Sequence, residues 1–225
     1  MSVVGIIPAA GAGERLGASV PKAFAVLGGK RLLEWSLAAL REVCDRVVVA
    51  VPPDRLTKGP GPLVNARLTK GPGPLVTVDF VAGGTHRSES VRAALSAAPE
   101  ATIAVVHDAA RPLVTPELVR RCIDALEGYD GAIAAAPVTD TVKEVDGVRV
   151  VNTPSRAGLW AVQTPQVFKA DVLRAALEGD VSAATDDASL VEARGGRVRV
   201  VEAPRENLKV TTPLDVRVAE LLLAD

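Results

Sequence analysis

A glycine-rich stretch near the N-terminus carries residue types that bind phosphate groups. Residues 8–17 read Pro-Ala-Ala-Gly-Ala-Gly-Glu-Arg-Leu-Gly, and a Pro-Lys pair follows at residues 21–22. Small side chains leave the backbone N–H groups open to a ligand, and successive N–H groups form a concavity that suits phosphate oxygens. Arg15 and Lys22 add two positive charges at its edge. The stretch therefore predicts a site for a polyphosphate.

The spacing of the glycines excludes two common phosphate-binding loops. A Walker A loop needs G-x-x-x-x-G-K-[ST], but Gly17 is followed by Ala18. A dinucleotide-binding loop needs G-x-G-x-x-G, and after Gly11 and Gly13 the third glycine falls one position late. The alternative is an ordinary turn between a strand and a helix. The two cations, and the proline before the lysine, favour the phosphate site.

Asp108 is a second candidate for chemistry, because it follows an apolar run at residues 102–106. Ligands of open parallel sheets bind at the carboxyl ends of the strands. A lone carboxylate there suits Mg²⁺, which takes one or two protein oxygens and completes its shell with phosphates and water. The alternative is that Asp108 only caps a turn. His107 is predicted to be structural, because adjacent strand positions point to opposite faces.

Strand-like and helix-like segments alternate along the chain, which predicts an α/β fold. We expect a mainly parallel twisted sheet, Rossmann-like, with helices on both faces. The strands are predicted at residues 3–7, 46–51, 76–81, 102–106, 132–136 and 197–202. Helices are predicted at residues 31–43, at 88–98 with Ser88 as its cap, from Thr115-Pro116, from Thr185-Asp186 to residue 193, and from Thr212-Pro213.

Residues 138–151 interrupt the alternation. Two short runs rich in valine flank Asp146-Gly147, which is a strong hairpin signal. Such a hairpin would project from the parallel sheet as an arm, and we assign residues 138–163 to the arm region. Because two-stranded hairpins are marginal alone in water, the arm is expected to pack on a second copy of the chain.

Residues 55–76 contain a duplication. The sequence Arg-Leu-Thr-Lys-Gly-Pro-Gly-Pro-Leu-Val occurs at residues 55–64 and again at 67–76. Two copies with a period of 12 do not make a solenoid, and Gly-Pro-Gly-Pro sustains neither a helix nor a central strand. We interpret the segment as a duplicated surface loop. Lys58 and Lys70 could form an anion site, but a solvated loop is the preferred interpretation.

The composition indicates one domain over residues 1–225. A chain of 225 residues holds one sizeable core without requiring a second domain. The apolar runs are of strand length and no secretory signal is visible, so a cytoplasmic protein without membrane contact is expected. Cys44 and Cys122 are isolated, as is usual for buried free thiols. A net charge of −1 gives no global field that would favour nucleic acid.

Together these residues resemble a known enzyme family. The loop with its Pro-Lys pair resembles that of the sugar-nucleotide-type nucleotidyltransferases. Other motifs narrow the resemblance to the 2-C-methyl-D-erythritol 4-phosphate cytidylyltransferases of the non-mevalonate isoprenoid route. They are Gly83-Gly84, Arg87, Ser90-Val91, His107-Asp108-Ala-Ala-Arg-Pro112, Ala136-Pro137-Val138, Asp140-Thr141, Lys143, Thr164-Pro165-Gln166, Thr185-Asp186 and Asn207-Leu208-Lys209-Val210-Thr211. The duplicated segment departs from the family pattern.

The resemblance implies a role for each candidate residue. Arg15 and Lys22 would stabilise the transition state at the α-phosphate and the leaving pyrophosphate, and Lys209 would brace the same phosphates. CTP would contact Ala9, Ala10, Gly11, Gly13, Gly83, Gly84, Thr85, Ser90 and Asp108, and Asp108 would hold Mg²⁺ or another divalent cation. The acceptor would be held by Arg111, Thr141, Arg156 and Thr185. The family often has an acidic residue at Thr85, and the alternative for Arg156 is a surface loop arginine.

The resemblance also implies a homodimer whose arms clasp, so that Thr141 and Arg156 serve the neighbouring subunit. Two rival functions stay open. One is a cytidylyltransferase for another polyol phosphate, such as ribitol 5-phosphate, which differs in the acceptor pocket. The other is a nucleotide-binding module without turnover, against which the cations around the phosphate site argue.

Overall fold

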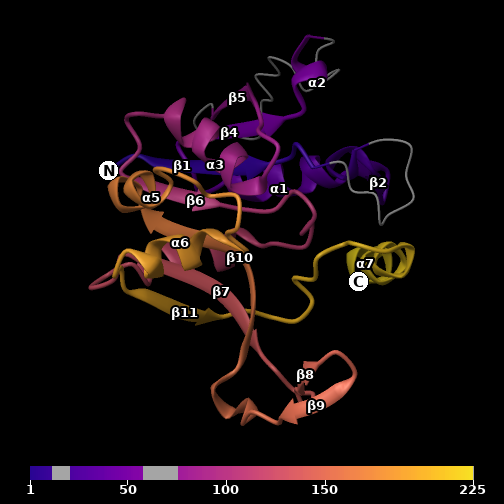
Figure 1. The fold of residues 1–225 in the computed structure, drawn as a ribbon. Coiled ribbons are helices and arrows are strands. Elements are labelled where there is room, and N and C mark those ends of the chain that lie inside the picture. The colour runs from indigo at the N-terminus through magenta and orange to yellow at the C-terminus, as the bar shows by residue number, and fades with distance from the viewer. Residues whose placement is uncertain (12–20, 58–75, 225) are drawn as a thin grey trace.

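A seven-stranded sheet forms the centre of the computed structural model, which describes residues 1–11, 21–57 and 76–224. Its strands are β1 (Val3–Pro8), β4 (Arg46–Val51), β5 (Thr77–Ala82), β6 (Ile103–Val106), β7 (Gly131–Pro137), β10 (Trp160–Lys169) and β11 (Val198–Glu202). Their order across the sheet is β11-β7-β10-β6-β1-β4-β5 (Figure 1). Neighbouring strands are parallel, except that β10 runs antiparallel to both β6 and β7. The mainly parallel sheet expected from the sequence is confirmed.

Helices cover both faces of this sheet, because alternate strand residues point to opposite faces. In β1, Ile7 joins the core cluster under α1 (Leu32–Leu40) and α4 (Pro116–Asp124). Ile6 joins the opposite cluster, under α3 (Arg87–Ser96), α5 (Ala170–Ala176) and α6 (Asp187–Ala193). Outside the sheet and the arm region lie η2 (Lys22–Phe24), β2 (Val26–Leu27), β3 (Lys30–Arg31), α2 (Pro53–Thr57) and α7 (Pro213–Ala224).

The predicted helix starts at Thr115-Pro116, Thr185-Asp186 and Thr212-Pro213 are confirmed, whereas the predicted Ser88 cap is wrong. The hydroxyl of Thr115 accepts from the Leu118 N–H at 3.2 Å, and Asp186 accepts from the Ser189 N–H at 3.0 Å. Ser88 does not cap α3. That helix begins one residue earlier, so the Ser88 side chain is buried and its hydroxyl donates to the Val181 carbonyl at 2.7 Å.

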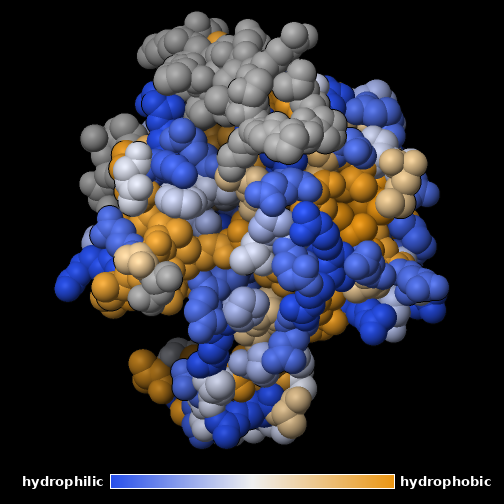
Figure 2. All heavy atoms as spheres, turned by 180° about the vertical axis from the view of Figure 1, so that it is seen from behind, coloured by the Kyte–Doolittle hydropathy of each residue, from blue (hydrophilic) through white to orange (hydrophobic). Residues whose placement is uncertain are grey.

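The predicted hairpin is confirmed as β8 (Glu144–Asp146) and β9 (Arg149–Asn152), which pair antiparallel. Gly147 in the turn has φ of +58°, a conformation that glycine adopts without steric cost. The hairpin extends away from the sheet, and apolar atoms lie on its surface (Figures 1 and 2). Residues 160–163 of the predicted arm region belong to β10, whose first residues pair with the end of β7.

Most of the duplicated segment lies outside the described residues. Of residues 55–76, only 55–57 and 76 are described, and the first three end helix α2 instead of forming a loop. Cys44 and Cys122 are buried free cysteines, as predicted. In the part of the chain that the structure describes, no helix is long and apolar enough to cross a membrane.

Candidate active site

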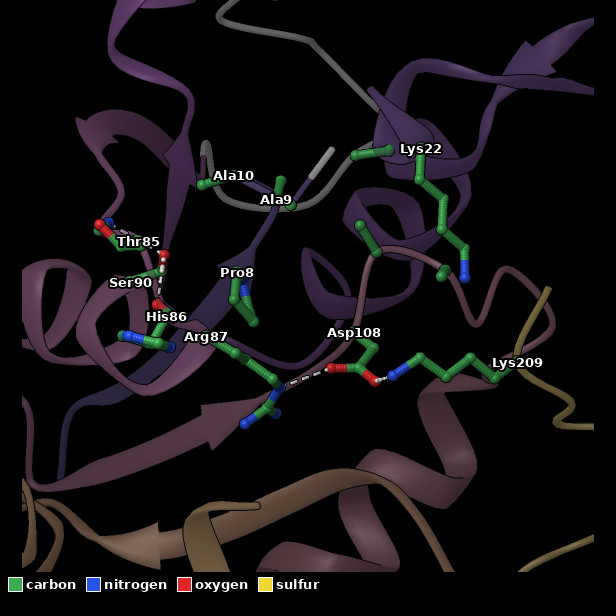
Figure 3. A pocket seen from close by; sticks show the side chains of 15 residues that line it. Pro8, Ala9, Ala10, Lys22, Thr85, His86, Arg87, Ser90, Asp108 and Lys209 are labelled. Atoms are coloured by element: carbon green, nitrogen blue, oxygen red, sulfur yellow. Dashed lines mark hydrogen bonds and ion pairs between the residues drawn. The ribbon is translucent and has the colours of Figure 1, made fainter. Parts of the chain in front are cut away.

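A cavity opens at the carboxyl ends of β1, β5 and β6, where ligands of open parallel sheets bind (Figure 3). On one side lies the described start of the glycine-rich loop, on another the turn before α3, and Lys22 faces them. The lining residues are Pro8, Ala9, Ala10, Gly11, Lys22, Ala23, Gly84, Thr85, His86, Arg87, Ser90, Asp108, Ala109, Ala110 and Lys209. Arg15 and Gly13 lie outside the described residues.

The turn between β5 and α3 is held tightly against the loop. The hydroxyl of Ser90 accepts from the Gly84 N–H at 3.1 Å and donates to the His86 carbonyl at 3.3 Å. A Cβ at Gly83 would collide with Ala10 and lie 2.8 Å from the Ser90 oxygen. Gly83 therefore lets two cavity walls approach each other, although it does not line the cavity itself.

Asp108 carries the negative charge at the centre of the site. Its carboxylate receives Arg87 Nε on Oδ1 at 3.0 Å and Lys209 Nζ on Oδ2 at 2.7 Å (Figure 3). Burial alone would raise the pKa of Asp108, but the charges of Arg87 and Lys209 outweigh it and hold that pKa well below its ordinary value. The carboxylate is therefore ionised at neutral pH.

Lys209 is brought to Asp108 by the segment between β11 and α7. The buried Asn207 donates through Nδ2 to the Thr164 carbonyl at 2.9 Å. Two residues beyond Lys209 on the chain, the hydroxyl of Thr211 lies 3.4 Å from Lys22 Nζ. This segment therefore positions Lys209 and also contacts Lys22, which is about 190 residues away in sequence.

A second cavity adjoins the first, and Arg87, Asp108 and Lys209 line both. The predicted acceptor residues Arg111 and Thr185 line this second cavity. Arg111 is nearly buried and donates through Nη1 to the Asn207 carbonyl at 2.7 Å. Two anions bound in these cavities would meet at the shared boundary.

A sequence model of the 2-C-methyl-D-erythritol 4-phosphate cytidylyltransferase family matches residues 3–225. An enzyme of this name from Nocardia farcinica is 46% identical over 226 positions, which cover 99% of this chain and 94% of the relative. The chain belongs to this family.

Solved structures of the family share its fold. The 2-C-methyl-D-erythritol 4-phosphate cytidylyltransferase of Thermus thermophilus is 37% identical and superposes with a TM-score of 0.78 over 100% of both chains. The 4-diphosphocytidyl-2C-methyl-D-erythritol synthase of Anaerococcus prevotii is 29% identical and gives a TM-score of 0.83, with 100% and 99% coverage.

Two residues that were predicted to bind the acceptor substrate lie away from both cavities. Thr141 precedes the arm strands and Arg156 lies in η4 (Arg156–Gly158), after them. The guanidinium of Arg156 donates to the carbonyl of Thr139 within the arm. Neither residue lines the first or the second cavity.

Arg87 is a site residue for which no role could be predicted from the sequence. Its partner Asp187 lies 100 residues further along the chain, so no local spacing connects the two. The only indication of Arg87 in the sequence was its place among the family motifs. Its position at both cavities makes it part of the site.

His107 is structural, as predicted. Its side chain is fully buried, Nε2–H donates to the Arg111 carbonyl at 3.1 Å, and Nδ1 accepts from the Thr164 hydroxyl at 3.0 Å. That hydroxyl in turn accepts from the Asp108 N–H at 3.0 Å. Burial lowers the pKa of His107 from 6.5 to about 4. A neutral imidazole with both nitrogens occupied is no general base for the cavity.

Buried His107 makes folding stability depend on pH. Because its folded pKa lies below the unfolded value, the unfolded chain binds more protons between pH 6.5 and about 4. We expect wild type to lose about 2 kcal/mol more than His107→Gln between pH 7 and pH 5, as followed by urea unfolding. Equal losses in the two proteins would contradict a neutral buried His107.

Proposed function

We propose that this chain transfers the cytidylyl group of CTP to 2-C-methyl-D-erythritol 4-phosphate. The products are 4-diphosphocytidyl-2-C-methyl-D-erythritol, a precursor of isoprenoids, and pyrophosphate. The observation that carries the proposal is the family match over residues 3–225. The cation-lined cavity at the strand ends agrees with it, because the reaction brings two polyanions together.

The reaction needs no general base from the protein. The second pKa of a phosphate monoester is about 6, so at neutral pH the attacking group is mostly a dianion. The protein has to hold both phosphates in line and to neutralise charge at the α-phosphorus and on pyrophosphate. Lysines and arginines suit that task, and Lys22 and Lys209 converge on the cavity from separate segments.

The nucleotide would lie over the small residues of the first cavity. Ala9, Ala10 and Gly11 present backbone to it, and the turn with Gly84, Thr85 and Ser90 forms the opposite wall. Arg15 and Gly13 complete the loop in this proposal, and Gly83 allows the close packing of the two walls. Arg15, Lys22 and Lys209 are the proposed catalytic residues.

Asp108 would hold Mg²⁺ together with bound phosphates, because a single carboxylate supplies only part of the ion's oxygen ligands. Among the described residues, no group of three or more His, Cys, Asp or Glu side chains could hold a metal. One ionised carboxylate next to a triphosphate is a usual Mg²⁺ arrangement. Lys209, whose side chain is 44% exposed, would leave Oδ2 of Asp108 for the phosphates. The bound ion would neutralise phosphate charge.

Release of pyrophosphate tests this function against its rivals. Wild-type protein with CTP and 2-C-methyl-D-erythritol 4-phosphate should release pyrophosphate, and CTP alone should give none. Release only with ribitol 5-phosphate would assign the rival acceptor. CTP binding without release under any of these conditions would identify a nucleotide-binding module.

We also propose a homodimer in which each arm completes the neighbouring site. Val145, Val148 and Val150 are exposed on the arm, where a second copy would cover them. Arg156 and Thr141 line neither of the two cavities described above, which supports a role in trans. Lys22, Arg111, Thr185 and Lys209 would act in cis.

A mixture of two inactive variants should recover activity. In a heterodimer of Lys22→Ala and Arg156→Ala subunits, one site carries both lesions and the other carries neither. Under equal random mixing, half of the dimers have one intact site of two, so about a quarter of wild-type activity is expected. Pyrophosphate release after verified subunit exchange measures it. Monomers in sedimentation, or no recovery, would refute the shared site.

A further inference from the structure

Asp187, the first residue of α6, is a buried carboxylate next to the site. Its side chain is 0% exposed, and Oδ2 accepts from Arg87 Nη1 at 2.6 Å. Oδ1 is buried without a partner among the described residues. Burial raises the pKa of Asp187, and the charge of Arg87 opposes that rise. A buried carboxylate is costly unless it is paired, so its arginine is firmly held.

Arg87 connects Asp187 with the centre of the site. Nη1 binds Asp187, and Nε binds Asp108, whose other oxygen binds Lys209. The result is a row of alternating charges, from buried Asp187 to half-exposed Lys209, along the boundary of the two cavities. The planar guanidinium can bridge two carboxylates in a fixed geometry, which an ammonium group cannot.

The start of α6 is anchored on the central sheet. Gln166 of β10 is buried, and its Oε1 accepts from the N–H groups of Asp187 and Ala188 at 3.2 and 3.3 Å. Its Nε2 donates to Asp186 Oδ2 at 2.9 Å. The backbone that carries the Asp187 carboxylate is therefore held in place, as the precise positioning of the Arg87 guanidinium requires.

We propose that Asp187 is a positioning residue that fixes Arg87, and through it Asp108, at the boundary of the nucleotide and acceptor cavities. The inference rests on the proposed function, because bound phosphates would draw Lys209 away from Asp108. Phosphates attract Arg87 equally, and Asp187 keeps its guanidinium on Asp108. Without Asp187, Arg87 turns to the phosphates and Asp108 loses its orientation.

The test is a kinetic comparison of wild type with Asp187→Asn, a substitution that removes the negative charge of the side chain and keeps its shape. We expect kcat to fall about 10- to 100-fold, as for a misplaced reacting group, while the KM for CTP stays unchanged or falls. In an Arg87→Gln background, Asp187→Asn should lower kcat no further, because its effect passes through Arg87. A merely structural role would not produce this non-additivity.

Asp79→Asn is the matched control. Asp79 pairs with Arg46 Nε at 2.6 Å, the same distance as between Asp187 and Arg87. The Asp79 side chain lies outside both cavities. Its kcat and both KM values should equal those of wild type. If Asp187→Asn does not fold, Arg87→Lys tests the bridge, since lysine keeps the charge but not the planar fork. Arg87→Lys should lower kcat without raising the KM for CTP.

Three outcomes would overturn the inference: a folded Asp187→Asn with wild-type kcat, additive losses in the two backgrounds, or Arg87→Lys with wild-type kcat. In each of them the wild type still releases pyrophosphate, so the proposed function stands. Absence of release by the wild type would overturn the proposed function and this inference together.

Discussion

Replacing Lys22 with alanine should lower kcat by at least about 10²-fold, the usual loss for a preorganised electrostatic donor. The affinity for CTP should fall much less. Lys22 lies across the cavity from Asp108, with its Nζ near the Thr211 hydroxyl, so its charge is in place before the phosphates arrive. A charge placed where negative charge develops stabilises the transition state more than the ground state. Steady-state kcat and KM for CTP measure the split.

Lys169→Ala is the matched control for this prediction. Lys169 is a more exposed lysine that pairs with Asp130 at 3.0 Å, away from both cavities. Its kcat should stay at the wild-type value. A Lys22→Ala enzyme with near-normal kcat and only a raised KM would show that Lys22 binds the ground state and does not act in the transition state.

Turnover should also collapse in Asp108→Asn and in wild type treated with excess chelator. The substitution removes the carboxylate that Arg87 and Lys209 share, and the chelator removes the cation proposed to bind there. The fold should survive, because Asp108 lies beyond the carboxyl end of β6 and outside the hydrophobic clusters. Pyrophosphate release and thermal unfolding of the same samples measure both quantities.

Added Mg²⁺ serves as the control, since it should restore the chelated wild type and leave Asp108→Asn inactive. Full activity of the wild type in excess chelator would contradict the metal requirement. Loss of the folded transition in Asp108→Asn would show instead that the carboxylate is needed for folding.

Most of the sheet could be predicted because its strands are continuous apolar runs, as in β4 with Arg-Val-Val-Val-Ala-Val. Strand β10 could not. It contains Pro165 between polar residues, and a proline inside a run argues against a central strand. The structure accommodates it where the pairing with β7 shifts register between Val162 and Gln166. A bulge of this kind leaves no clear mark in the sequence.

The proposed nucleotide side of the site was easier to predict than the rest. Its loop is contiguous, so residue type and spacing were enough to predict phosphate binding, which stays a prediction. Asp108 could be placed because it follows a clear strand. The pair of Arg87 and Asp187 could not be predicted, because α3 and α6 are distant in sequence and only packing brings them together. The arm was predicted as a hairpin, whereas its partner subunit stays a prediction.

Phosphorus NMR of the reaction mixture tests the central claim most directly. With CTP, Mg²⁺, wild-type protein and equal amounts of 2-C-methyl-D-erythritol 4-phosphate and ribitol 5-phosphate, only the monoester signal of the methylerythritol compound should disappear. Signals of a diphosphate diester and of pyrophosphate should grow in equal amounts. Consumption of ribitol 5-phosphate in its place, or no diphosphate diester at all, would contradict the proposed function.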